Sequence, residues 1–226
     1  MNRPNVVSGE NREIKSDRDG PKRGRPPAGQ VGEVDERILQ AAEFFFLREG
    51  YARTTLQKIA ATARIGNTTL YKRYLNKEEL FAAVLHRSVE VAVKRLKDVP
   101  RGGTAGKRLR EAGIALGRSA LSRDVIAIMR ISAAEAETFP NIARMGYHLG
   151  FDSSVDYAAK AIAGSDRPAD LAAAWPAASR FVEVALHPLE LQGMFGVDLD
   201  VLRTRIVPSV DDAIAILVRT GLLDSA

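Results

Sequence analysis

Apolar side chains recur at helical spacing along most of this chain. The first such segment extends from about Val34 to Glu49, and Gly50 directly after it predicts the end of a helix. Its apolar face consists of Ile38, Ala42, Phe45 and Phe46. The strict apolar–polar alternation of half-buried strands is absent, so the pattern predicts an all-α fold.

Two short helices and a longer one are expected next. A threonine cap at Thr54–Thr55 opens a helix with an apolar side at Leu56, Ile59, Ala60 and Ala63. Residues 64–67 read as a turn, followed by a helix from about Asn67 to Tyr74. Asn76 then caps a helix that continues to about Lys97, with acidic residues in its first turn that suit the helix dipole.

The remaining chain predicts further helices and no fixed-period repeat. They are placed at about 106–122, 124–137, 141–163, 168–187 and 201–220, with a loop near 193–200. We therefore expect three parts. They are a disordered basic arm at 1–30, a three-helix domain at 31–81, and a larger helical domain at 82–226.

Positive charge is concentrated in the first part of the chain. The net charge is +5, and it divides into +3 for residues 1–30, +3 for 31–98 and −1 for 99–226. Such asymmetry favours a polyanion as partner of the N-terminal part, although an uneven solvated surface is the simpler alternative. Within the arm, Arg23 and Arg25 lie in a Lys-Arg-Gly-Arg-Pro-Pro segment that resembles AT-hook minor-groove binders. A generic basic tail explains the same residues.

The window from Arg53 to Lys77 combines the two short helices with unusual charge. It holds six basic residues and no Asp or Glu, where average composition would supply about three acids. Two short helices joined by a tight turn form a helix-turn-helix, whose second helix enters the DNA major groove. Carboxylates there would repel phosphates, so their absence favours DNA as the partner.

The residues of this region also resemble a known family. The resemblance rests on Ile38 to Ala42, Phe46, Gly50-Tyr51, Thr54-Thr55, Ile59-Ala60, Ala63, Leu70-Tyr71 and Lys77 to Leu80. Together they are similar to the DNA-binding domain of the TetR family. The resemblance implies an all-α homodimer with a C-terminal ligand pocket. It also implies that this homodimer dissociates from its double-stranded DNA operator when a small molecule binds in the pocket.

Individual contacts follow from the resemblance. It implies phosphate or backbone contacts for Thr55, Tyr71 and Lys77, and an additional contact for Arg73. Base reading is expected from the exposed front of the second helix. The complete expected DNA-binding set is Thr54, Thr55, Asn67, Thr68, Thr69, Tyr71, Lys72, Arg73 and Lys77, with Arg23 and Arg25 of the arm. A half-buried core role for Tyr71 and simple capping roles for the threonines remain open.

Two positions depart from the family pattern. Arg64 stands where a turn glycine is usual, and a left-handed conformation there would cost an arginine about 1 kcal/mol. Gly66 replaces the usual Ser or Thr cap of the second helix. These two departures leave the first residue of the second helix undetermined by the sequence.

The C-terminal part carries a second resemblance. The segment 134–143, with Phe139-Pro140 at its centre, resembles AefR-like C-terminal domains, and residues 181–189 add support. In such regulators the last two long helices dimerise, here 168–187 and 201–220. Their expected faces are Leu171, Ala174, Ala178, Val182 and Ala185, and Ile206, Val210, Ala213, Ile214 and Leu217. Packing of these faces within one subunit is the alternative.

A ligand pocket needs apolar walls with a few polar groups. The candidates are Met129, Phe139, Met145, Tyr147, His148, Phe151, Trp175 and Phe181, and each could equally belong to the core. A hydrophobic or aromatic effector would suit them. No cofactor is expected, and the lack of cysteine excludes disulfides and thiolate metal sites.

The function expected from the sequence is a DNA-binding transcriptional regulator, most simply a repressor released by an effector. The alternative is a ligand-independent regulator controlled by its abundance or by a protein partner. An enzyme is disfavoured because the three histidines are widely separated and no nucleophile elbow, P-loop or dinucleotide motif occurs. No membrane segment or signal peptide is recognised, so we expect a cytoplasmic protein.

Overall fold

The computed structural model describes residues 28–94, 96 and 98–224, and the expected arm with Arg23 and Arg25 lies outside this range apart from its last residues. The described residues form helices and no strand, which confirms the all-α prediction. The helices are α1 (Ala28–Arg53), α2 (Leu56–Thr62), α3 (Asn67–Tyr71), α4 (Lys77–Lys94), α5 (Ala105–Ala120), α6 (Arg123–Ala134), α7 (Pro140–Ala163), α8 (Pro168–Ala185), α9 (His187–Met194), α10 (Leu199–Thr204) and α11 (Ile206–Arg219).

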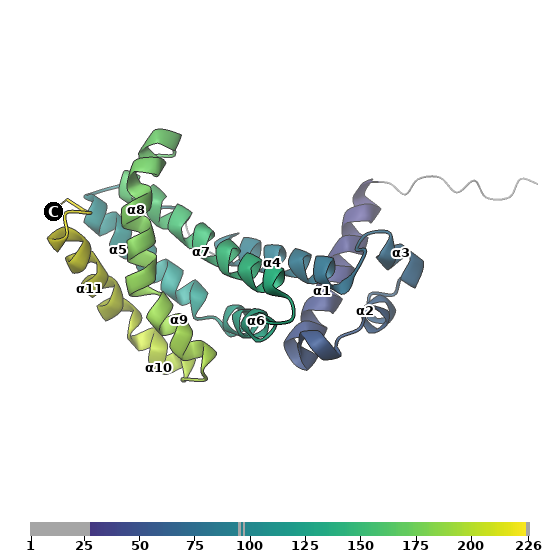
Figure 1. Ribbon diagram of the computed structural model, residues 1–226. Coiled ribbons are helices and arrows are strands. Elements are labelled where there is room, and N and C mark those ends of the chain that lie inside the picture. Colours follow the sequence, from purple (N-terminus) through teal and green to yellow (C-terminus); the bar gives the residue numbers. More distant parts are fainter. Residues whose placement is uncertain (1–27, 95, 97, 225–226) are drawn as a thin grey trace, which may run out of the picture.

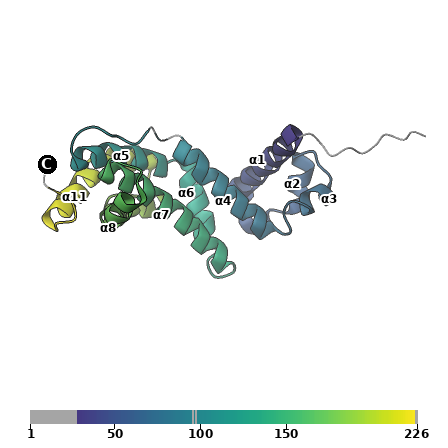
Figure 2. The same cartoon turned by 90° about the horizontal axis from the view of Figure 1, so that it is seen from above.

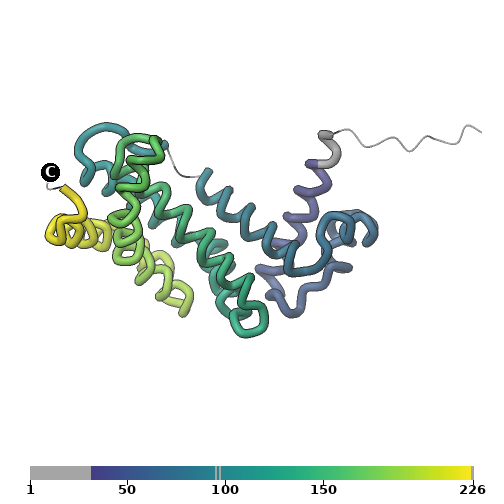
Figure 3. The backbone as a smooth tube through the Cα atoms, turned by 45° about the horizontal axis from the view of Figure 1, so that its top comes forward, coloured from purple at the N-terminus to yellow at the C-terminus, as the bar shows by residue number. Residues whose placement is uncertain are grey.

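The molecule is elongated, with its two ends built from different helices. Figure 1 shows α1, α2 and α3 at one end and α5, α8 and α11 at the other. α4 and α7 run between the ends, which remains clear when the molecule is viewed from above (Figure 2) and along the tube in Figure 3. α4 passes through the expected domain boundary near residue 81.

A first hydrophobic core joins α1, α2, α3 and the start of α4. Phe46, Tyr51 and Phe81 are almost fully buried there, and their rings lie within 4.8–5.7 Å of one another. The predicted face of the first helix takes part through Ile38, Ala42 and Phe46, whereas Phe45 packs at its margin. Ile128 of α6 and Ile142 of α7 also enter this core, so the C-terminal part is packed directly against the N-terminal one.

Gly50 interrupts α1, as the sequence predicts, but does not end it. Its φ of 80° and ψ of 169° belong to a backbone region that glycine enters far more readily than other residues. One further turn, Tyr51–Arg53, follows the kink. This turn directs the Tyr51 ring into the core and brings the chain to Thr54.

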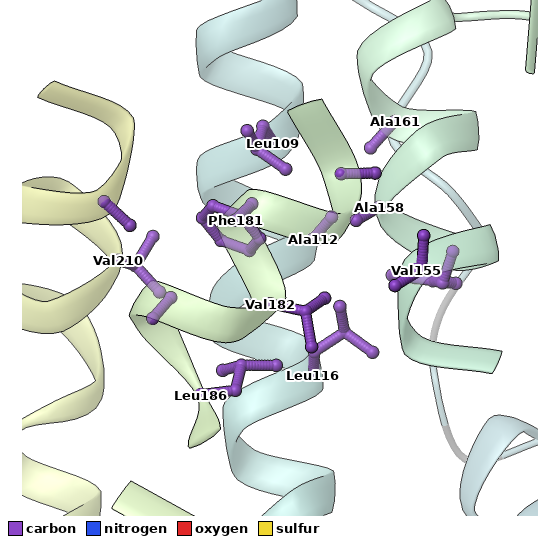
Figure 4. Close-up of a cluster of buried hydrophobic side chains, with 14 of the residues drawn as sticks. Leu109, Ala112, Leu116, Val155, Ala158, Ala161, Phe181, Val182, Leu186 and Val210 are labelled. Carbon is purple, nitrogen blue, oxygen red and sulfur yellow. The ribbon is translucent and has the colours of Figure 1, made fainter. Parts of the chain in front are cut away.

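The second core holds α5, α7, α8 and α11 together. Phe181 of α8 is fully buried, and Figure 4 places it between Leu109 and Ala112 of α5 and Val210 of α11. α5 approaches this ring closely because position 113 is glycine: a Cβ there would overlap the Phe181 ring and lie 3.1 Å from Val210 Cγ2. The packing thus depends on one large and one absent side chain facing each other.

Two helices expected at the C-terminus are four in the structure. The segment expected at 168–187 ends at Ala185 and is followed by α9, while α10 and α11 replace the single helix 201–220. Pro188 and Pro208 lie in the first turns of α9 and α11. Proline lacks an amide proton and its ring clashes with the carbonyl four residues earlier, which favours the end of each preceding helix, although α8 tolerates Pro176 in its interior.

The faces expected to form a dimer are largely used within the subunit. Ala174, Ala178, Val182 and Ala185 of α8 are buried, as are Ile206, Val210, Ala213 and Leu217 of α11. Leu171 and Ile214 are half-buried. The alternative interpretation of these stripes as intramolecular packing is therefore correct for eight of the ten residues.

Candidate nucleic-acid interface and ligand cavity

The turn between α2 and α3 is closed by Arg64 in a left-handed conformation. Arg64 has a φ of 54°, the only positive value at a non-glycine residue among those described. Its amide donates to the Ala61 carbonyl at 3.1 Å, and the Ile65 amide donates to the Ala60 carbonyl at 3.0 Å. These two bonds form a Schellman motif, in which this position is most often glycine. The strain anticipated from the sequence is present.

Replacing Arg64 with glycine should therefore stabilise the protein. Removing the Cβ relieves about 1 kcal/mol of left-handed strain, equivalent to a rise of roughly 2–4 °C in the melting temperature. Thermal unfolding followed by circular dichroism measures this change. Arg64→Ala is the matched control, because it removes the same charge and keeps the Cβ. Equal melting temperatures for the two variants would contradict the strain argument.

Gly66 marks the beginning of α3. It has an extended conformation (φ −72°, ψ 146°), and its carbonyl accepts hydrogen bonds from the amides of Thr69 at 2.9 Å and Leu70 at 3.2 Å. It is the N-cap and makes no side-chain cap bond, as expected for glycine. α3 ends at Tyr71, three residues earlier than expected.

α3 buries one residue and exposes the rest. Leu70 is fully buried in the first core, whereas every other side chain of the helix is exposed, and Tyr71 retains 42% of its accessible surface. The open face consists of Asn67, Thr68, Thr69 and Tyr71, continued by Lys72. Thr55 is also exposed, and its hydroxyl caps α2 by accepting the Lys58 amide at 3.3 Å. We refer to these six side chains as the α3 surface.

Three other expected contact residues are already engaged inside the protein. Thr54 is 1% exposed and donates its hydroxyl proton to the Gly50 carbonyl at 2.8 Å, so its side chain does not reach the surface. Its inclusion in the DNA-binding set is thus unsupported by the geometry. Arg73 of the α3–α4 connection pairs with Asp35 of α1 at 2.8 Å. These bonds anchor the helix-turn-helix to α1.

Lys77 is the most heavily engaged of the three. Its ammonium donates to the carbonyls of Tyr51 at 2.8 Å, Ala52 at 3.3 Å and Thr54 at 3.2 Å, and it lies 4.2 Å from the centre of the Tyr51 ring. Burial lowers the pKa of the Lys77 amine below its ordinary value. Lys77 therefore holds the end of α1 against the start of α4, and its contact with phosphate stays a prediction.

The basic residues of the α3 region differ in their partners. Lys58 pairs with Glu49 at 2.7 Å, so the acid missing from the window is supplied by the preceding helix. Arg64 and Lys72 have no ion pair with any described residue and are exposed. Arg53 is also exposed and its Nε donates to the Glu49 carbonyl, so these three are the exposed basic residues of the window without an ion pair among the described residues.

A cavity of about 640 Å³ lies between α4, α6, α7 and α9. Three of the expected pocket residues line it: Met129 from α6, and Tyr147 and Phe151 from α7. The two rings are stacked, with centres 5.6 Å apart and planes 8° apart. Most of the remaining wall is aliphatic, so the cavity suits an apolar molecule of ligand size.

The other five expected pocket residues do not line this cavity. Phe139 and Met145 pack against the first core, and the Phe139 ring lies 5.0 Å from that of Tyr51. Phe181 is buried in the second core. His148 is exposed on α7, and Trp175 on α8 retains 39% of its surface. Helical spacing could not separate these positions, because apolar residues on one helix can face either a cavity or a core.

The polar side chains of the cavity wall were not among the expected pocket residues apart from Tyr147. They include Ser132, His187 and Glu190, together with Ser88, Ser119, Ser153 and Ser154. Burial lowers the pKa of His187. Its ring is tilted against those of Phe151 and Tyr147, with ring centres 5.3 and 5.9 Å apart. Burial raises the pKa of Glu190 from 4.5 to about 7. The only signal in the sequence was the i,i+3 spacing of His187 and Glu190, which places them on one helix face.

A larger and more open hollow, of about 1050 Å³, lies beside α1, α4 and α5. Its charged residues include Arg87 and Glu43, which are paired with each other, and Arg87 also pairs with Glu36. These ion pairs join α4 to α1. The cavity between α4, α6, α7 and α9, with its unpaired polar groups and mostly apolar wall, is the stronger candidate for a ligand site.

The corner between α6 and α7 connects the cavity to the first core. Met129 and Ser132 on α6 line the cavity, and Phe139, at the end of the following connection, contacts Tyr51. Ile128 and Ile142 flank the corner and enter the first core. A displacement of α6 or α7 would therefore act directly on the helices that position α3.

Comparison with known proteins identifies both parts of the chain. Residues 38–84 match the model of bacterial regulatory proteins of the tetR family, and residues 107–220 match that of the AefR-like transcriptional repressor C-terminal domain. The HTH-type transcriptional repressor SCO4008 of Streptomyces coelicolor is 43% identical over 53 residues, which are 24% of this chain and 28% of that protein.

Solved structures show the same architecture over most of the chain. A TetR-family regulator from Mesorhizobium loti has a TM-score of 0.67 at 21% identity, covering 83% of this chain and 98% of its own. The flavonoid-responsive regulator FrrA has a TM-score of 0.61 at 23% identity, covering 84% and 97%. These similarities establish the fold.

No helix among the described residues has the length and apolar character needed to cross a bilayer. The N-terminal match contains the helix-turn-helix described above, and the C-terminal match contains most of the second core and the cavity walls other than α4. The chain belongs to the TetR family of bacterial transcriptional regulators and carries an AefR-like repressor C-terminal domain.

Proposed function

We propose that this regulator binds double-stranded operator DNA through the α3 surface and is released when a small molecule occupies the cavity. The observation that supports operator binding is the exposed face of α3, where short polar side chains can approach base edges. Tyr71 and Thr55 would meet the DNA backbone, and Lys72 and Arg64 would face phosphates. Asn67, Thr68 and Thr69 are the proposed base readers.

The cavity favours an effector-responsive regulator over a ligand-independent one. A ligand shifts a conformational equilibrium only by binding one state more tightly than the other. Filling the space between α6 and α7 would favour a different position of the α6–α7 corner, and the Phe139–Tyr51 contact would transmit it to the first core. The orientation of α3 would then no longer suit the operator.

We further propose that the active form is a homodimer. One small helix-turn-helix makes few phosphate contacts, and two copies related by a two-fold axis would read two half-sites. Because the inner stripes of α8 and α11 are used inside the subunit, the partner must contact other faces of these helices. Trp175 on α8 and Val207 on α11 keep 39% and 37% of their surfaces exposed there.

Substitution of Lys72 tests the DNA-binding surface. Lys72→Ala should weaken binding to every duplex, and the slope of log K against log salt should become shallower by about one, because one phosphate contact is lost. Tyr71→Ala should also weaken binding. Lys94→Ala is the matched control, since Lys94 is an exposed lysine in the last turn of α4, at the opposite end of that helix from the α3–α4 connection. Equal loss with both lysine variants would contradict the assignment.

Selection from a random duplex library identifies the operator and tests the readers. The wild-type protein should enrich an inverted repeat if it binds as a dimer. Thr68→Ala or Thr69→Ala should enrich a changed sequence at one position of each half-site, with less effect on non-specific binding. An unaltered consensus for both variants would remove them from the proposed reading set.

A further inference from the structure

Among the described residues that line the cavity, Glu190 is the only one with a formal charge. It projects from α9, and burial raises the pKa of its carboxyl to about 7. The described residues provide it with no ion pair and no side-chain hydrogen bond. Glu190 is half-buried, and a carboxyl group that loses much of its water without gaining a partner is costly to the folded protein. This cost points to a ligand that supplies the partner.

The basic residues near α9 are committed elsewhere. Arg130 of α6 donates to the carbonyls of Gly193 and Met194 at the end of α9, at 3.0 and 2.9 Å. Arg205 donates to the amide oxygen of Gln192 at 2.7 Å. His187 shares the cavity, but burial lowers its pKa and favours the uncharged ring. Glu190 is thus left without a counter-ion in the described structure.

A second unsatisfied group lies on the same cavity. The hydroxyl of Ser132 on α6 is buried and has no hydrogen-bond partner, and Ser132 is 5% exposed. Buried hydroxyls are nearly always paired, so an orphan on a cavity wall points to a missing partner. Position 146 on α7 accommodates the Ser132 hydroxyl because it is glycine; a Cβ there would lie 3.0 Å from the Ser132 oxygen.

The rest of the wall suits an apolar body with a cation. The stacked rings of Tyr147 and Phe151 expose aromatic faces, which attract positive charge, and the aliphatic residues exclude water. Among the described residues no Lys or Arg lines the cavity, so a carboxylate or phosphate ligand would meet Glu190 without a compensating charge from this part of the chain. The charges of the described cavity wall therefore disfavour an anionic effector.

We propose that the cavity selects an apolar organic cation, an aromatic or aliphatic body carrying one amine, with Glu190 as counter-ion and the Ser132 hydroxyl as a second polar contact. This inference rests on the proposed effector-binding function and specifies its ligand class. The amine replaces the water that Glu190 has lost, and the apolar body fills the space beside Tyr147 and Phe151. Charge, rather than shape alone, determines which molecules enter.

Three probes with one apolar body separate charge from shape. They are 4-phenylbenzylamine, 4-phenylbenzyl alcohol and biphenyl-4-carboxylate, and calorimetry with the full chain at about pH 8 measures their affinities. The amine should bind at least about tenfold more tightly than the alcohol, and the carboxylate should bind least. Glu190→Gln should remove the preference for the amine and leave the alcohol within about threefold of its wild-type affinity.

Glu137→Gln is the matched control, because Glu137 is exposed and does not line the cavity. It should leave all three affinities unchanged. Binding of the alcohol or carboxylate at least as tightly as the amine would overturn the inference while retaining the cavity as a ligand site. If no probe binds the wild-type protein, both the inference and the proposed effector function lose their support. A preference that survives Glu190→Gln would also overturn the role of Glu190.

Discussion

Replacing Phe181 with alanine should lower the free energy of unfolding by about 3–5 kcal/mol, the range for removing a fully buried aromatic ring. The ring is 0% exposed and fills the space between α5, α8 and α11 (Figure 4). The surrounding helices cannot collapse fully onto the void because each is also packed against α7 or its neighbours. Urea unfolding followed by the fluorescence of Trp175, the single tryptophan, measures the loss.

The opposing glycine makes the same prediction more specific. Gly113→Ala should destabilise the protein by about 1–3 kcal/mol, because its Cβ would overlap the Phe181 ring. Combined with Phe181→Leu, the alanine should cost less than it does alone, because the shorter side chain leaves room for the methyl group. Phe195→Ala is the control, since Phe195 is 83% exposed, and it should change stability by less than about 0.5 kcal/mol. Strict additivity of the two core changes would contradict the close approach of α5.

Stability should also fall as the pH rises from about 4.5 to about 7, with Glu190 as the cause. Burial raises the pKa of Glu190 from 4.5 to about 7, so in this interval the folded protein holds a proton that the unfolded chain has released. The sign follows directly: the native state binds more protons, and stability is lost with increasing pH. The loss is up to about 3 kcal/mol, from a pKa shift of about 2.5.

Glu190→Gln should remove this loss, because glutamine does not titrate. Above about pH 7 the variant should be more stable than the wild-type protein, and the difference should shrink towards about pH 4.5. His187, whose pKa is lowered by burial, destabilises the fold at acidic pH in both proteins, so the difference between the two curves isolates Glu190. Urea unfolding at several pH values gives both curves, with Glu137→Gln as the control. Parallel curves for wild type and Glu190→Gln would show that the carboxyl is not desolvated.

The local features of the N-terminal part were predictable from sequence because they depend on short-range geometry. Thr55 as the cap of α2, the strain at Arg64 and the break at Gly50 all follow from backbone conformations that few residue types adopt. Helix positions in the C-terminal part were also recognisable. The subdivision into α9, α10 and α11 was missed, although Pro188 and Pro208 were the available signals.

Which core or cavity each apolar helix face contacts was not predictable from short-range patterns. Periodicity shows that Phe139, Phe181 and Tyr147 lie on apolar sides of helices, but one enters the first core, one the second core and one the cavity wall. The partners of charged residues were equally hidden. Lys77 and Arg73 were expected at phosphate, and in the fold they bind carbonyls and Asp35 across separations of 23 residues or more.

The sequence by itself determined the all-α fold and the position of the helix-turn-helix, because helix signals and the acid-free basic window act over a few residues. The family was indicated separately, by the resemblance of the residues around this motif to the TetR family. Tertiary structure alone decided which side chains of the helix-turn-helix remain exposed and available to DNA. It buried Thr54, engaged Lys77 and left α3 exposed from Asn67 to Tyr71 apart from Leu70. It also enclosed Glu190 and Ser132 in one cavity, since helices distant in sequence must pack before a group loses water without gaining a partner.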